Sequence, residues 1–269
     1  MNSKTKIIAV ISEKGGVGKT ATLLNLAGAL TVTCNKKVLA ADLNPQQDLA
    51  TNLGYVPDGN KTISELIRDQ VDTFPIVTDD DKKHIIKHSD FGLDFMPATR
   101  QTLEYLPKII TESDKDCILN VFQYDMFMPY DYIFIDCKDS LKEHLVPQIL
   151  TACDYVMPVA EVGINSLYDI AEVIKKISRL NNVIEIAGIV LNKTTSNSNI
   201  SKEIIESVEE GFGEYLFDTH IPDRKAQIEN ANRIHRPCVI ARKNGKKNTL
   251  AKYYANLAKE FLTRMGDEK

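Results

Sequence analysis

The feature that most constrains this chain is a glycine-rich loop close to its start. Residues 7–11 are an uninterrupted apolar run, typical of a buried strand, and Gly-Gly-Val-Gly-Lys-Thr follows at residues 15–20. Leucine and alanine then recur at helical spacing over residues 23–30. Glycine lets successive backbone N–H groups point at one anion, and the start of a helix adds a positive dipole end. The order of strand, loop and helix therefore predicts a phosphate-binding site.

The polar residues of this loop fit a nucleoside triphosphate with its metal ion. Lys19 is placed to reach the β- and γ-phosphates, and the Thr20 hydroxyl is placed to bind Mg²⁺. A strict phosphate-loop pattern has glycine where this chain has Glu13, and a glycine-rich turn with surface lysines is the alternative interpretation. The predicted cofactors are ATP and Mg²⁺, and the predicted cofactor-binding residues of the loop are Lys14, Gly15, Gly16, Val17, Gly18, Lys19, Thr20 and Ala21.

Two further buried strands are predicted to end in carboxylates. Residues 37–42 end in Asp42, with Asn44 in the turn that follows, and residues 132–136 end in Asp136. Strands of a doubly wound sheet present their polar residues at their carboxyl ends, so these side chains are expected beside the phosphate loop. We expect Asp136 to hold Mg²⁺ through water, with Thr20 and Asp42 as the other residues of the metal site, although an ordinary strand cap remains the alternative for Asp136.

Strand and helix patterns alternate along the whole chain, which indicates an α/β fold with a doubly wound, mostly parallel sheet and helices on both faces. A length of 269 residues suits one domain, covering 1–269. We expect an irregular acidic stretch at residues 72–92, one strand at 184–191 and a short strand at 215–219. His84 and His88 are spaced for a metal on one helix face, but a solvated face is the better interpretation because no third ligand is evident.

Composition excludes several classes of protein. The amino terminus runs directly into a predicted core strand, leaving no room for a signal peptide, and no apolar run is long enough to span a bilayer. Five scattered cysteines without a C-x-x-C pair suggest reduced thiols, hence a cytoplasmic protein. The pattern at 249–265 is amphipathic, and we expect core packing rather than membrane binding because its polar face mixes charges.

Charge is unevenly distributed. Residues 220–252 contain nine lysines and arginines against two acidic residues, a net charge of +7, whereas the whole chain carries −4. A basic segment on an otherwise acidic protein suits an anionic partner such as nucleic acid, and a solvated surface is the alternative.

Together these motifs resemble the ParA/MinD group of deviant phosphate-loop ATPases, and within it the short ParA proteins that lack an N-terminal DNA-binding extension. The resemblance covers nearly the whole chain. The residues that carry it are 14–20, 25–27, 38–46, 93–98, 130–137 with 140–141, and 221–222.

The resemblance implies a homodimer that forms in the ATP state, with Lys14 crossing to the phosphates of the partner subunit. It places Asn192, Pro222 and Asp223 at the adenine. It also implies a ParB-like centromere-binding partner, no membrane, and association with the nucleoid through non-specific DNA when ATP is bound. The residues that it assigns to DNA are Arg233, Arg236, Arg242, Lys243, Lys246 and Lys247.

The chain departs from the family pattern at two points. Asn44 stands where the family has an aspartate that orients the attacking water, and an amide cannot accept a proton from that water. Lys138 and Asp139 replace two prolines after Asp136. The expected catalytic residues are Lys14, Lys19, Asn44 and Asp42. Because Asn44 replaces the expected aspartate, we expect ATP hydrolysis to be slow.

Three classes of function remain open from sequence. The first is an ATPase for plasmid or chromosome partition. The second is a MinD-like or other cargo-positioning ATPase that acts as an ATP-gated scaffold on a membrane or protein partner. The third, a metabolic enzyme of the same fold, lacks a cluster-ligating cysteine pair or a substrate signature.

Overall fold

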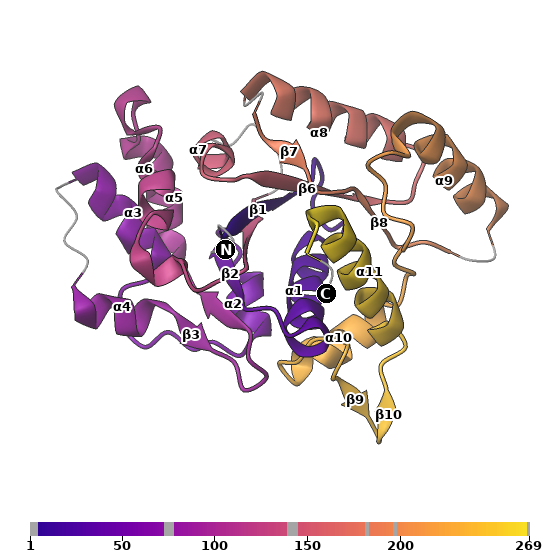
Figure 1. Cartoon of the computed structure of the whole chain (residues 1–269), viewed down its shortest axis with the longest axis horizontal. Coiled ribbons are helices and arrows are strands. Elements are labelled where there is room, and N and C mark those ends of the chain that lie inside the picture. Colours follow the sequence, from indigo (N-terminus) through magenta and orange to yellow (C-terminus); the bar gives the residue numbers. More distant parts are fainter. Residues whose placement is uncertain (1–4, 73–77, 139–144, 181–182, 196–197, 268–269) are drawn as a thin grey trace.

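The computed structural model describes residues 5–72, 78–138, 145–180, 183–195 and 198–267. Its main sheet has the strand order β3-β4-β2-β5-β1-β6-β7, and β8 extends β6 (Figure 1). The strands are β1 (Lys6–Ile11), β2 (Val38–Leu43), β3 (Lys87–His88), β4 (Asp94–Met96), β5 (Tyr132–Cys137), β6 (Tyr155–Glu161), β7 (Glu185–Ile186) and β8 (Val190–Asn192). Pairing is parallel except between β3 and β4, which confirms the predicted, mostly parallel sheet.

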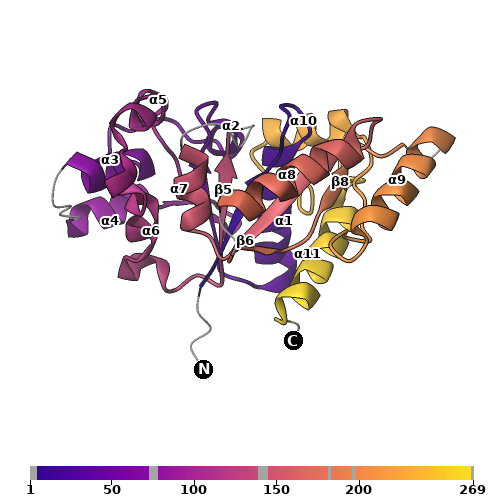
Figure 2. The ribbon, with the colours of Figure 1, turned by 90° about the horizontal axis from the view of Figure 1, so that it is seen from above.

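Helices cover both faces of this sheet, as predicted. One face carries α1 (Lys19–Cys34), α2 (Asp48–Asn52), α10 (Lys225–Arg233) and α11 (Ala251–Met265). The other carries α3 (Ile63–Asp72), α4 (Asp79–Ile85), α5 (Arg100–Ile109), α6 (Cys117–Phe122), α7 (Leu145–Thr151) and α8 (Ser166–Leu180). Figures 1 and 2 show α9 (Asn199–Phe212) at the end of the molecule away from α3–α6.

The central strands are buried on both sides, which explains their continuous apolar sequences. In β1, Ile8 and Val10 face the core under α1 and α11, whereas Ala9 and Ile11 face the core under α3 and α6. The register aligns the carboxyl ends of three neighbouring strands, because Asp136 of β5 pairs with both Val10 of β1 and Asp42 of β2. The chemistry-bearing residues therefore meet at one edge of the sheet.

The prediction for residues 72–92 is wrong. This stretch contains α4 and β3. Thr78 is the N-cap of α4 and forms a capping box: its side chain accepts the Asp81 backbone N–H, and the Asp81 side chain accepts the Thr78 backbone N–H. His84 lies on α4 and His88 on β3, so the two histidines do not share a helix face. Among the described residues, no group of three or more histidine, cysteine, aspartate or glutamate side chains is placed to hold a metal ion.

The predicted strand at 184–191 is divided into β7 and β8. Gly188 between them has φ 149°, and a Cβ there would lie 2.4 Å from the Phe217 ring, so the backbone turns where only glycine fits. The strand expected at 215–219 is only an isolated bridge between Leu216 and Ile189. The prediction that parallel units continue to the end of the chain is also wrong, because β9 (Arg242–Lys243) and β10 (Lys246–Lys247) form an antiparallel hairpin.

The amphipathic pattern near the carboxyl end packs in the core as expected, since Tyr254, Leu257 and Phe261 of α11 are buried against α1. Within the described residues, no helix is long and apolar enough to cross a membrane.

Candidate nucleotide site

The glycine-rich loop joins β1 to α1 with a backbone that needs glycine. Gly16 and Gly18 have φ 77° and 92°, values that favour glycine strongly. Gly18 is also the N-cap of α1, and a Cβ there would lie 2.2 Å from the Asn192 side-chain nitrogen. The loop therefore exposes backbone N–H groups at the amino end of a 16-residue helix, the geometry that binds phosphate.

Lys19 and Thr20, at the start of α1, both bond the Asp136 side chain near the end of β5. The Lys19 Nζ lies 2.9 Å from one Asp136 oxygen, and the Thr20 hydroxyl donates to the other at 2.7 Å. Lys19 is 4% exposed and Asp136 is fully buried, so this pair excludes water. A hydroxyl and a carboxylate this close supply the oxygen ligands that Mg²⁺ prefers. The residues present therefore fit Mg²⁺ bound with a nucleotide.

Asp42 lies next to Asp136 on the adjacent strand. Burial, followed by the neighbouring Asp136 carboxylate, raises the pKa of Asp42 well above its usual range. Its oxygens accept the backbone N–H groups of Asn44, at 3.3 Å, and Ala50, at 2.9 Å. The two oxygens thus fix the turn after β2 and the start of α2. Asp42 therefore has a positioning role in addition to its predicted roles in metal binding and catalysis.

Asn44 connects that turn to the end of β5. Its side-chain nitrogen lies 3.5 Å from the Cys137 carbonyl, and its side-chain oxygen accepts the Gln46 N–H at 3.1 Å. The side chain is buried. An amide can serve both partners, whereas an aspartate could not donate to Cys137. The residues around Asn44 therefore suit an asparagine, although the family pattern has aspartate at this position.

The two residues before the glycines are tied to α8 by ion pairs that sequence reasoning missed. Lys14 lies 2.7 Å from Asp169, and Glu13 lies 2.6 Å from Lys176. Asp169 and Lys176 are seven residues apart and so share one face of α8. No local sequence signal marks these partners, because the loop and α8 are separated by about half the chain.

A small cavity of about 230 Å³ opens beside the loop. The structure brings together there all three residues that the resemblance assigned to adenine, Asn192, Pro222 and Asp223, next to Gly18 and Ala21. Sequence reasoning did not include the rest of the lining, which comes from the end of β8, the segment that leads into α10, the start of α10 and the start of α11: Lys193, Ile221, Arg224, Lys225, Ile228, Leu250 and Tyr254.

The predicted DNA-binding residues fall into two groups. Arg242, Lys243, Lys246 and Lys247 are all exposed and make up the β9–β10 hairpin, whereas Arg233 ends α10 and Arg236 forms an ion pair with Asp90. Asn244 and Gly245 at the hairpin tip have φ 51° and 76°. An Asn-Gly pair of this kind is a known signal for a β-hairpin turn, so this hairpin could have been predicted from the sequence.

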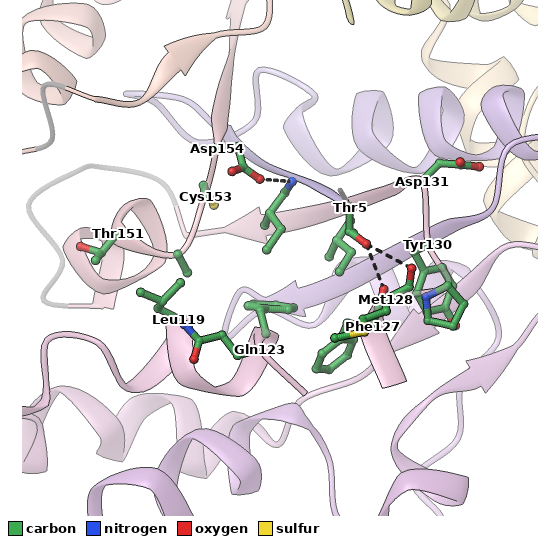
Figure 3. A pocket seen from close by; sticks show the side chains of 15 residues that line it. Thr5, Leu119, Gln123, Phe127, Met128, Tyr130, Asp131, Thr151, Cys153 and Asp154 are labelled. Carbon is green, nitrogen blue, oxygen red and sulfur yellow. Dashed lines mark hydrogen bonds between the residues drawn. The ribbon is translucent and has the colours of Figure 1, made fainter. Parts of the chain in front are cut away.

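A second cavity, larger than the one beside the loop, lies elsewhere, at the amino ends of the strands. It has a volume of about 890 Å³ and is bounded by the starts of β1, β5 and β6. Figure 3 shows Leu119, Gln123 and Phe127 around it, with Cys153 and Asp154 at the start of β6. It is separated by the length of the strands from the glycine-rich loop. By volume alone this cavity would be the better candidate for a ligand site. The residues that can bind phosphate, however, lie at the opposite ends of the strands.

Comparison with known proteins identifies the family. A family described as an AAA domain matches residues 5–187. Soj, a sporulation initiation inhibitor protein of Bacillus subtilis, is 30% identical over 95% of this chain and 97% of its own length. The chromosome partitioning protein ParA of Caulobacter vibrioides is 27% identical over 98% of this chain and 96% of its own. The chain belongs to the ParA family.

A ParA-family fold also explains the shared architecture with solved structures. A plasmid partition protein of Borrelia burgdorferi bound to AMPPNP superposes with a TM-score of 0.75 at 21% identity, covering 97% of this chain and 100% of that chain. At this level of identity the likeness concerns the fold. The mostly parallel sheet and the glycine-rich loop between β1 and α1 accordingly belong to the fold that these proteins share.

Proposed function

We propose that this chain is an ATP-dependent partition ATPase, a single domain that dimerises when it binds Mg·ATP and then binds DNA without sequence preference. The observation that carries this proposal is the set of contacts joining Lys19 and Thr20 to Asp136 beneath the glycine-rich loop. In this arrangement Lys19 would bind the phosphates, while Thr20 and Asp136 would hold Mg²⁺, directly or through water. When bound, Mg²⁺ neutralises charge on the phosphates.

Lys14 supports the dimer part of the proposal. Its side chain is 49% exposed, and its ion pair with Asp169 is therefore accessible to solvent and weak. A lysine so held can leave Asp169 and reach the phosphates of a partner subunit, where it would stabilise charge developing during hydrolysis.

This competition gives a first prediction. Replacing Asp169 with asparagine is expected to favour the ATP-bound dimer by up to about 5-fold for each Lys14 that crosses to the partner subunit, because an exposed ion pair contributes at most about 1 kcal/mol. Sedimentation velocity at graded protein concentrations with Mg·ATP measures the change. Glu172→Gln is the matched control, since Glu172 pairs with Lys175 on the same helix and not with the loop. A weaker dimer in Asp169→Asn than in the control would contradict the role of Asp169.

The basic hairpin supports DNA as the anionic partner. Its register places Lys246 opposite Lys243 and Lys247 opposite Arg242, so like charges face each other across the strands. Such pairs destabilise a hairpin unless an anion neutralises them. Figure 1 shows the hairpin projecting beyond α10, away from the main sheet. A projecting cationic ribbon suits contact with the phosphates of a DNA duplex. Contacts to phosphates carry no sequence information directly, so such binding is not sequence-specific.

A second prediction concerns these cations. Changing all four hairpin cations to glutamine is expected to weaken DNA binding and to reduce the slope of log affinity against log salt by about 3–4, close to 0.9 for each lost phosphate contact. Fluorescence anisotropy with random-sequence DNA and Mg·ATP at several salt concentrations provides the measurement. The matched control changes four exposed lysines from other surfaces: Lys83, Lys108, Lys202 and Lys259.

The outcomes of that experiment separate the two leading functions. An unchanged salt slope in the hairpin variant would place DNA binding elsewhere on the chain. Absence of DNA binding by the unaltered protein in Mg·ATP, with binding to anionic vesicles instead, would favour a MinD-like positioning ATPase. We propose a ParB-like protein as the partner that triggers release, and nucleoid association in the ATP state.

Asn44 leads us to propose slow hydrolysis. Its amide can hold a water molecule by hydrogen bonds but cannot take a proton from it. The chain would then remain in the ATP-bound dimer for longer than a family member with aspartate at this position.

A further inference from the structure

Asn192 ends β8, and its side chain is buried against the glycine-rich loop. The side-chain nitrogen donates to the Val17 carbonyl at 2.9 Å and lies 3.5 Å from the Thr22 hydroxyl. The side-chain oxygen accepts the Lys193 backbone N–H at 2.9 Å. One amide therefore contacts the loop, the first turn of α1 and its own strand end.

An asparagine recognises a base with the N–H groups and the oxygen of its amide, and in Asn192 these groups already bond the protein. A primary amide has two N–H donors, and both have partners here, Val17 and Thr22. Its oxygen already accepts from Lys193 and retains one lone pair. Reading an adenine with the N–H groups would require the side chain to give up its contact with Val17 of the loop or with Thr22 of α1.

The surroundings hold the amide in this orientation. The Asn192 carbonyl accepts the Val162 N–H at 2.9 Å, and Lys193 forms an ion pair with Glu161 at 2.5 Å, so the end of β8 is fastened to the end of β6. On the other side, the missing side chain of Gly18 makes room for the amide, because a Cβ would lie 2.2 Å from its nitrogen. Val17 lies between two glycines at positive φ, and its carbonyl is the loop group that the Asn192 amide contacts.

We infer that Asn192 is a positioning residue for the glycine-rich loop, which sets affinity for the triphosphate and leaves the choice of base to the rest of the cavity. This inference rests on the proposed ATP site and differs from the adenine-contact role that the resemblance implies. Base selection then falls to the other residues that line the cavity, such as Pro222, Asp223 and Ile228.

The experiment compares three ligands by isothermal titration calorimetry with Mg²⁺: ATP, GTP and inorganic triphosphate. In Asn192→Ala, all three affinities are expected to fall by a similar factor of roughly 10, the effect of losing one or two hydrogen bonds. The ratio of ATP to GTP affinity is expected to stay unchanged. Asn192→Asp keeps an acceptor for Lys193 but faces the Val17 carbonyl with an oxygen, so it is expected to lose affinity for all three ligands as well.

Asn248→Ala is the matched control for loss of a buried amide. The Asn248 side chain donates to the Gln227 carbonyl at 3.0 Å and accepts the Leu250 N–H at 2.8 Å, away from the loop. It is expected to lower the melting temperature about as much as Asn192→Ala while retaining triphosphate affinity. Amide hydrogen exchange adds a readout without ligand: Asn192→Ala is expected to accelerate exchange in residues 15–20, and Asn248→Ala is not.

The outcomes are distinguishable. Loss of ATP affinity alone in Asn192→Ala, with inorganic triphosphate unaffected, would overturn the inference and assign Asn192 to the base. Equal affinities before and after the change would overturn it too, as would equal losses in Asn248→Ala. If the unaltered chain binds none of the three ligands, the proposed ATP site fails and the inference fails with it.

Discussion

Replacing Lys19 with alanine is expected to abolish measurable Mg·ATP binding and to destabilise the fold by about 3–5 kcal/mol. The two effects share one cause. Lys19 is the charge partner of Asp136, which is fully buried, and removing one member of a buried ion pair leaves the other charge uncompensated. The same ammonium group is the one placed to bind the phosphates. Chemical denaturation measures the free energy of unfolding, and calorimetry measures binding.

Lys14→Ala is the matched control for this change, because both lysines belong to the same loop and both form an ion pair. Lys14 is half exposed, and its pair with Asp169 is accessible to solvent. We expect a stability change within about 1 kcal/mol and nearly unchanged ATP binding by the monomer, with loss of the ATP-bound dimer. Equal destabilisation in the two variants would contradict the distinction between the buried and the exposed pair.

Asn44→Asp is expected to raise the single-turnover rate of ATP hydrolysis by about 10²–10⁴, the usual contribution of a positioned proton acceptor. The carboxylate would stand just after β2, next to the Cys137 carbonyl at the end of β5, where the family pattern has the aspartate that orients the attacking water. Release of labelled phosphate from pre-bound ATP measures the rate. The ATP-bound dimer is expected to dissociate correspondingly faster.

The same substitution carries a structural cost. The Asn44 amide faces the Cys137 carbonyl, and an ionised carboxylate cannot donate to it, so we expect a loss of stability of about 1–3 kcal/mol. Asn44→Ala is the control, since it removes the same contact without adding a proton acceptor and should not accelerate hydrolysis. Equal rates in Asn44→Asp and the unaltered chain would show that another group orients the water.

Much of the site could be predicted because its determinants are local in sequence. The loop at residues 15–20 requires glycine where φ is positive, and its neighbours alternate as a strand and a helix must. Buried strands that end in Asp42 and Asp136 meet the loop because parallel strands bring their carboxyl ends to one edge of a sheet. These rules need no knowledge of distant contacts.

Local patterns failed where tertiary packing or unusual turns decided the outcome. The acidic stretch at 72–92 has low hydrophobicity, yet α4 forms because Thr78 caps it and Ile85 is buried in the core. The strand at 184–191 reads as continuous, but the Phe217 ring packs against Gly188 and divides it. Asp139, one of the two family departures after Asp136, lies outside the described residues.

The sequence by itself determined the class of the fold, the phosphate loop and the pair of strand-end carboxylates, because backbone geometry and hydrophobic periodicity are encoded in neighbouring residues. Only the tertiary structure decided what each polar group does. It pairs Lys14 with Asp169, turns the Asn192 amide toward Val17, and commits both oxygens of Asp42 to backbone N–H groups after β2. Hydrogen bonds and ion pairs form between groups that the fold brings together, and their partners therefore cannot be read from spacing along the chain.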